Sequence, residues 1–221
     1  MQTFDTPAPI TAVLDIAAGR IQVVAADRAD TTVEVLPADP AKSRDVKTAG
    51  QTTVDYTDGV LRITTAGRGN QLFGPSGSLQ VTVHLPAGSH LQATTASTEL
   101  RTTGPLGEVT FDGAYRHITI DEAASLHLTA VDGDVQVGRL GGPAQITTAR
   151  GTITIGAAAR GTVELRTQMG DITIGAAPGV CAALDASTGH GRVSNALKND
   201  GTTELAIHAT TGQGDITARS L

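Results

Sequence analysis

The sequence repeats itself, and the repeat limits this chain to very few architectures. From residue 91 onward the chain consists of seven units, each with two segments in which apolar and other residues alternate. The apolar residue that begins the second segment follows the one that begins the first by nine residues in five units and by eleven in the last two. The first positions are Leu91, Val109, Leu126, Ala144, Val163, Ala182 and Leu205, and the second are Leu100, Ile118, Val135, Ile153, Ile172, Val193 and Ile216. Self-similarity at a short, nearly fixed period is typical of solenoids.

The residues inside each unit predict β-strands. The segments Gly133–Gly138, Gly151–Gly156 and Gly170–Gly175 share a glycine, two apolar residues in alternation and a second glycine. Alternation with a period of two indicates half-buried strands, and glycine supplies the turns between them. Such a unit cannot bury its apolar face alone, so we expect stacked coils about 4.8 Å apart with parallel strands. Since crossovers between parallel strands are right-handed, the sequence predicts an all-β fold, a right-handed parallel β-helix (β-solenoid) with coils of roughly 18 residues and two main sheets.

We expect one solenoid domain over residues 1–221. Residues 91–221 carry the regular repeats, whereas residues 1–90 are less regular and are expected to cap one end of the core. Candidate strands in this first part are Ala12–Ile16, Arg20–Ala25, Thr32–Leu36, Thr52–Thr57, Val60–Thr64 and Leu79–Leu85. Residues 38–50 and 66–78 are expected to be loops. The scarcity of aromatic residues, 2% of the chain, fits a thin core of aliphatic side chains.

The same register predicts which side chains share a column. An inward column is Phe111, Leu128, Ile146, Leu165, Leu184 and Ile207, and the outward column beside it is Asp112, Thr129, Thr147, Arg166, Asp185 and His208. Arg166, Asp185 and His208 would then lie on successive coils. A solvated ladder of complementary charges is the favoured interpretation, with a carbohydrate-active or carbohydrate-binding β-helix as the alternative.

One phrase of the sequence resembles a known family. The run Val81–Thr95 reads VTVHLPAGSHLQATT, a strand followed by Pro-x-Gly and a second strand, and the Gly-Asp-Ile-Thr-Ile units come after it. This is similar to the bacterial putative-adhesin family, a β-strand-repeat domain of unknown function, over roughly Ile10 to Leu221. The resemblance implies a β-helix without a defined catalytic site, so no functional residue is carried over from it.

Residues that could carry chemistry have simpler structural explanations. Aspartates recur at turns, but consecutive units do not share the calcium-binding nonapeptide, so turn formation is favoured over calcium binding. The six histidines lie in different units. Cys181 is the only cysteine and lies in an apolar stretch, where a buried, inert thiol is the favoured interpretation. The glycine-rich segment around Gly67 and Gly74 lacks the Gly-Lys-Ser/Thr ending of a phosphate-binding loop. We therefore expect no metal, no cofactor and no catalytic residue.

Leu72 and Phe73 are large apolar residues flanked by glycine and proline. We expect them to fold back and cap the solenoid end, and the alternative is an exposed interaction loop.

Charge and hydropathy exclude several kinds of partner. The net charge is −6, and no cluster of lysine and arginine indicates nucleic-acid binding. No segment is long and apolar enough to span a membrane, and no secretory leader is visible. A cytoplasmic location is expected, although a secreted chain trimmed of its leader would look the same. The sequence thus predicts a non-enzymatic scaffold or protein-interaction module, with a protein partner or self-association.

Overall fold

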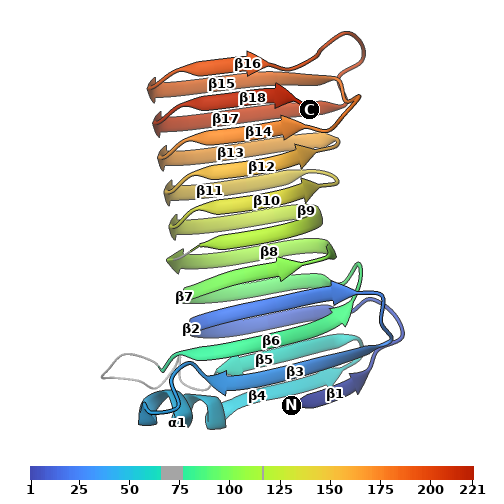
Figure 1. Ribbon diagram of the computed structural model, residues 1–221, viewed down its shortest axis with the longest axis vertical. Helices are drawn as coiled ribbons and strands as arrows, with labels where there is room; N and C mark the ends of the chain where they lie inside the picture. Colours follow the sequence, from blue (N-terminus) through green and yellow to red (C-terminus); the bar gives the residue numbers. More distant parts are fainter. Residues whose placement is uncertain (66–76, 116) are drawn as a thin grey trace. The chain divides into compact units, whose positions relative to one another are not determined.

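The computed structural model describes residues 1–65, 77–115 and 117–221. The chain forms two compact units, Met1–Arg116 (unit 1) and His117–Leu221 (unit 2). Almost all regular structure in both is β-strand, which confirms the all-β class (Figure 1). Right-handedness, the 18-residue coil and a single continuous solenoid stay predictions.

Unit 1 contains eight strands and one helix among its described residues. They are β1 (Gln2–Asp5), β2 (Thr11–Ala26), β3 (Asp30–Pro37), α1 (Ser43–Gln51), β4 (Thr52–Thr57), β5 (Val60–Thr65), β6 (Leu79–Pro86), β7 (His90–Thr103) and β8 (Pro105–Tyr115). The long strands β2 and β7 run in parallel along both their halves. The first half of β2 also pairs with β5, and the second half pairs with β6. Antiparallel strands complete the unit, since β3 pairs with β1 and β6, and β4 pairs with β5.

The helix α1 corrects the prediction of a loop over residues 38–50. No side chain caps its N-terminus, and its sequence SRDVKTAGQ shows no strong apolar stripe. What holds it is Asp45, which is buried and accepts a hydrogen bond of 2.9 Å from the Ser78 backbone N–H. The helix thus depends on a tertiary contact that the local pattern does not contain.

Unit 2 is built from parallel coils. Its strands are β9 (Ile118–Asp132), β10 (Val135–Leu140), β11 (Ala144–Arg150), β12 (Ile153–Ala158), β13 (Gly161–Met169), β14 (Ile172–Ala176), β15 (Ala182–His190), β16 (Val193–Ala196), β17 (Leu205–Gln213) and β18 (Ile216–Ser220). One parallel stack runs through β9, β11, β13, β17 and β15, and a second runs through β9, β10, β12, β14, β18 and β16. Both stacks belong to one continuous sheet, where the sequence predicts two main sheets. Inward side chains form buried aliphatic columns, as the alternation predicts.

The order of the last two coils in space is the reverse of their order in the chain. Strands β17 and β18 lie between β13–β14 and β15–β16, so the coil that comes last in the sequence is enclosed on both sides (Figure 1). We call β17–β18 the inserted coil and β15–β16 the terminal coil. The expected stacking, in which β15 follows β13 directly, is therefore wrong.

Hydrogen bonds at the turns between paired strands, at Gly170 and Gly214, agree with this order. The buried Thr211 hydroxyl on the inserted coil donates to the Gly170 carbonyl (2.9 Å), and the Thr188 hydroxyl on the terminal coil donates to the Gly214 carbonyl (2.9 Å). Gly214 has φ +146°, and a side-chain carbon there would overlap the Gly170 carbonyl oxygen. Only glycine permits this close approach of successive turns.

Polarity explains why the coils are ordered this way. Ile216 and Ala218 of the inserted coil are fully buried, whereas their partners on the terminal coil, Val193 and Asn195, are exposed. Asn195 occupies an inward position, where a buried amide without partners would be costly. Placing the more polar coil outermost leaves Asn195 in contact with water, as expected for a terminal repeat.

Candidate interaction surface

The terminal coil presents an open strand edge. Within the part of the chain that the structure describes, β15 pairs only with β17, and β16 pairs only with β18. Their outer row of backbone N–H and C=O groups is therefore available to another strand, apart from the Ala182 N–H, which donates to the Lys198 carbonyl at 3.0 Å. An open edge of this kind is a template for pairing with another chain.

Hydrogen bonds inside unit 2 show which groups face that edge. The Leu205 N–H donates to the Cys181 carbonyl and the Ile216 N–H donates to the Arg192 carbonyl, so inward residues point their N–H groups at the next coil. By the same alternation, the N–H groups of Leu184, Ala186 and Val193 point away from the inserted coil. These groups form the open edge.

The predicted ladder of Arg166, Asp185 and His208 has a different register. Arg166 pairs with Thr210, whereas His208 lies between Glu164 on one side and Asp185 on the other. His208 Nδ1 is 3.5 Å from Asp185 Oδ2, and Arg166 contacts Glu164 of its own strand at 3.9 Å. Asp185 and His208 are register partners as predicted, whereas β17 pairs with β13 two residues away from the expected register, which moves Arg166 out of the column. The expected column of three is therefore wrong.

The turn aspartates serve the coils themselves. Asp134 Oδ1 accepts the Thr152 N–H, Asp171 Oδ1 accepts the Asp215 N–H, and Asp215 Oδ1 accepts the Arg192 N–H, each at 2.8 Å. The favoured structural role is thus observed, although each partner belongs to the neighbouring coil and not to the aspartate's own turn. These bonds lock successive turns together.

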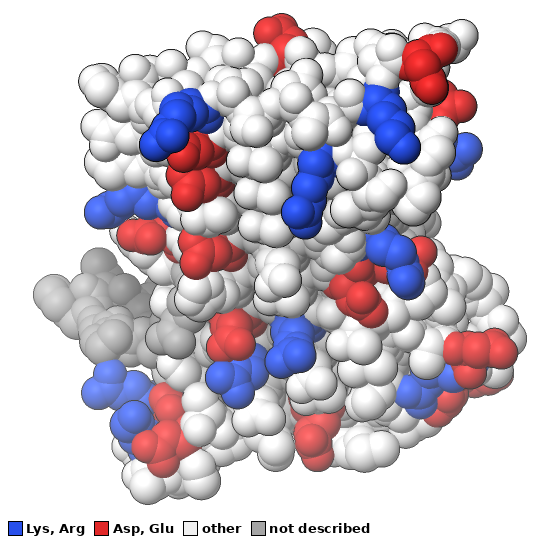
Figure 2. All heavy atoms as spheres, turned by 45° about the horizontal axis from the view of Figure 1, so that its top comes forward, with Lys and Arg blue, Asp and Glu red and all other residues white. Residues whose placement is uncertain are grey.

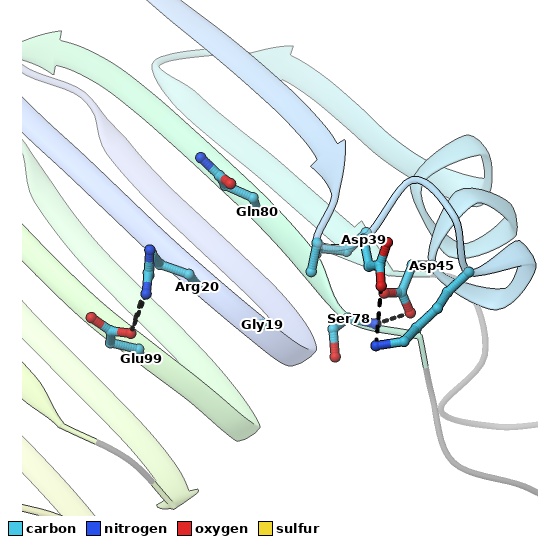
Figure 3. A pocket seen from close by; sticks show the side chains of 10 residues that line it. Gly19, Arg20, Asp39, Asp45, Ser78, Gln80 and Glu99 are labelled. Carbon is cyan, nitrogen blue, oxygen red and sulfur yellow. Dashed lines mark hydrogen bonds and ion pairs between the residues drawn. The ribbon is translucent and has the colours of Figure 1, made fainter.

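A polar pocket of about 320 Å³ lies in unit 1 where α1 approaches β2, β6 and β7 (Figure 3). Its charged groups are already paired with one another. Arg20 contacts Glu99 at 3.1 Å, Lys42 contacts Asp39 at 3.3 Å, and Asp45 holds the Ser78 N–H. The Ala41 N–H donates to Asp39 and, as the largest effect, lowers the pKa of that carboxyl. Arg20–Glu99 joins β2 to β7, and Lys42–Asp39 lies within the connection before α1, while the Asp45 bond ties α1 to the start of the segment that leads into β6.

Charged side chains elsewhere also occur in pairs of opposite sign. Figure 2 shows blue and red side chains side by side on the face it draws. Arg139 contacts Glu122 on the neighbouring strand, and Arg150 is 3.5 Å from Asp132. The hydrogen bond and charge of Glu122 raise the pKa of Arg139. Nucleic-acid sites carry clustered lysine and arginine, and these paired charges are not of that kind.

Cys181 lies beside the open edge, in the turn that leads into β15. Its Sγ donates to Asp200 Oδ1 at 3.1 Å, and this hydrogen bond raises the pKa of the thiol. A thiol with a raised pKa is a poor nucleophile, because the thiolate is the reactive form. The side chain is partly accessible and not fully buried, unlike the expectation from its apolar neighbours.

Two further results concern residues outside this surface. Leu72 and Phe73 lie outside the described residues, so both interpretations of their loop stay predictions. No helix in the described part of the chain is long and apolar enough to cross a membrane.

Comparisons with known proteins extend over nearly the whole chain. The family model Toastrack DUF4097 matches residues 13–220. A putative adhesin from Bacteroides fragilis is 15% identical with a TM-score of 0.54, covering 98% of this chain and 95% of that one. A putative adhesin from Parabacteroides distasonis is 14% identical with a TM-score of 0.48 over the same shares of both chains. At this identity the Bacteroides fragilis structure supports the fold alone. No curated protein matches the chain.

Proposed function

Because the chain belongs to the Toastrack DUF4097 family, we propose that it is a non-enzymatic, adhesin-like interaction module that binds a protein partner. The family match also confirms the resemblance inferred from Val81–Thr95. The observation that carries the proposal is the open edge of β15 and β16. It offers backbone groups in a fixed geometry beside two partly exposed apolar side chains, Leu184 and Val193.

The edge lacks several of the devices with which proteins block pairing. Native edge strands often carry lysine, proline or bulges, but β15 reads AALDASTGH and β16, a short strand, reads VSNA. Asp185 is the only carboxylate on the two strands, and its side chain points outward, 84% exposed. An extended segment of a partner would add a strand here, with main-chain hydrogen bonds providing affinity.

Catalysis has less support than binding. Arg166, Asp185 and His208 do not converge as a column, and the Asp185–His208 contact lies on a strongly exposed surface. Exposed ion pairs of this kind contribute well under about 1 kcal/mol. We therefore expect D185A/H208A to bind the partner as the wild type does.

The test blocks the edge without disturbing the interior. A186P removes an N–H that faces away from β17, so no existing ladder bond is lost, whereas the matched control S187A changes an exposed hydroxyl on the same strand. Each variant is first checked by circular dichroism and then used to capture proteins from a lysate of the source cells. We expect proteins captured by the wild type and by S187A to be lost with A186P. Equal capture by a folded A186P would overturn the proposal.

A further inference from the structure

The inserted coil is bound along both of its edges by segments that precede it in the chain. Strand β17 pairs with β13 over Gly161–Met169 and with β15 over Ala182–His190. Strand β18 pairs in the same way with β14 and β16. The space between β13–β14 and the terminal coil is therefore a complete binding slot for one coil.

The inward face of the inserted coil provides the remaining contacts. Leu205, Ile207, Ala209, Ile216 and Ala218 are all buried, each at most 1% exposed. Burial of such side chains contributes strongly to stability. None of these contacts depends on whether the coil is joined to the slot that holds it, because they involve only the coil and its neighbours.

The connection to the inserted coil is longer than the path requires. Where the other coils of unit 2 return from the β10–β12–β14 stack to the β11–β13–β15 side, the connections are residues 141–143, 159–160 and 177–181. The connection before β17 is residues 197–204, and nearly all of it is exposed. Fully extended, eight residues span up to about 27 Å, several coil spacings. This segment has the length and exposure of a hinge.

We propose that two copies of this chain exchange their inserted coils, so that β17 and β18 of each copy occupy the slot of the other. The exchange reproduces every contact between one coil and the next. It re-routes residues 197–204, which in the single chain bond to the coils through Lys198 N–H to Ser220 Oγ at 2.9 Å and Cys181 Sγ to Asp200 Oδ1 at 3.1 Å. Such exchange is a low-cost route to a dimer because no new surface has to be made complementary. It goes beyond the proposed function, which uses the open edge and leaves the inserted coil in place.

The experiment cross-links neighbouring coils. Ser187 and Thr210 are register partners, both exposed, on the terminal and inserted coils, so S187C/T210C in a C181A background places two thiols one coil spacing apart. The matched control is T129C/T147C in the same background, since these register partners lie on β9 and β11, which do not exchange. The full-length variants are concentrated and warmed toward the unfolding midpoint, cooled, and separated by size with light scattering. A short bis-thiol cross-linker is then applied to each fraction.

We expect S187C/T210C from the dimer fraction to run as a covalent dimer on a non-reducing denaturing gel, and from the monomer fraction as a monomer. The control is expected to run as a monomer from both fractions. The exchange is refuted if concentrated protein forms no dimer, or if the cross-linked S187C/T210C dimer separates into single chains on the gel.

A second measurement uses no cysteine substitution. The A186P variant blocks the open edge but keeps the hydrogen bonds between β15 and β17, because the Ala186 N–H faces away from β17. An exchanged dimer therefore persists in A186P, whereas an edge-paired dimer is lost. Light scattering of the wild type and of A186P after the same warming therefore separates the two kinds of contact. A dimer that disappears in a folded A186P would refute coil exchange and leave the proposed edge function standing.

Discussion

The reversed order of the last two coils makes a quantitative prediction about two equivalent side chains. Ile216 and Val193 are register partners on neighbouring strands and belong to the same inward column, but Ile216 is fully buried and Val193 is 46% exposed. In chain order their environments would be interchanged, because the terminal coil would be enclosed and the inserted coil outermost. Truncating each side chain to alanine therefore reports the order of the coils.

The expected magnitudes follow from the atoms removed. I216A deletes three buried carbons, worth about 2.4 kcal/mol at about 0.8 kcal/mol each, and the cavity left behind raises the cost to about 3–4 kcal/mol. V193A deletes two carbons that are about half in contact with water, so its cost is about 0.8 kcal/mol. The ratio of the two losses of stability is more reliable than either value, since both substitutions lie in unit 2.

Urea unfolding followed by far-UV circular dichroism measures both free energies. Tyrosine fluorescence does not serve, because Tyr56 and Tyr115 both belong to unit 1 and the chain has no tryptophan. An unchanged slope with urea concentration shows that a midpoint shift reflects stability. A folded V193A that loses as much stability as I216A, or more, would refute the reversed order.

Two further predictions concern the corner and the thiol. G170A is expected to destabilise unit 2 by roughly 3–5 kcal/mol, because residue 170 has φ +145° and its side-chain carbon would overlap the Gly151 carbonyl oxygen. Thermal unfolding measures this against the matched control G50A, whose new side chain lies in open space in α1, and equal midpoints would contradict the prediction. In D200N the hydrogen-bond acceptor that raises the Cys181 pKa loses its charge, so the thiol is expected to titrate at lower pH. Iodoacetamide should therefore modify D200N faster than the wild type at pH 8, and equal rates from pH 7 to 10 would show that Asp200 does not control the thiol.

The period of the repeats was enough to predict the strands and most of the inward columns. Ile118, Val135, Ile153 and Ile172 hold the same place in successive units and pair in parallel, because alternation fixes which side chains enter the core. Periodicity cannot say which coil lies beside which, since every coil has the same pattern. The helix α1 was missed for a related reason, because its anchor is the long-range bond from Ser78 to Asp45.

One residue in the sequence did carry information about the coil order. Asn195 stands at a position where Val137, Ile155 and Ile174 in the other coils are apolar. An amide at an inward position is acceptable only where water reaches it, so that coil has to be outermost, whatever its place in the chain. Polar residues at inward positions thus indicate which coil of a solenoid is terminal.

The same argument explains why the edge of this protein is open. A coil that follows the terminal one in sequence would ordinarily cover it, but here that following coil, β17–β18, has the more apolar inward face and gains more from being enclosed. Burying Ile216 and Ala218 between two coils removes apolar surface from water on both sides. Enclosing Asn195, whose Oδ1 accepts the Leu197 N–H, would cost roughly 1–3 kcal/mol for side-chain amide N–H groups cut off from water. The more stable arrangement therefore leaves β15 and β16 outermost, with one row of backbone groups unpaired by any described strand. The energetics of folding thus place the open edge at this end of unit 2.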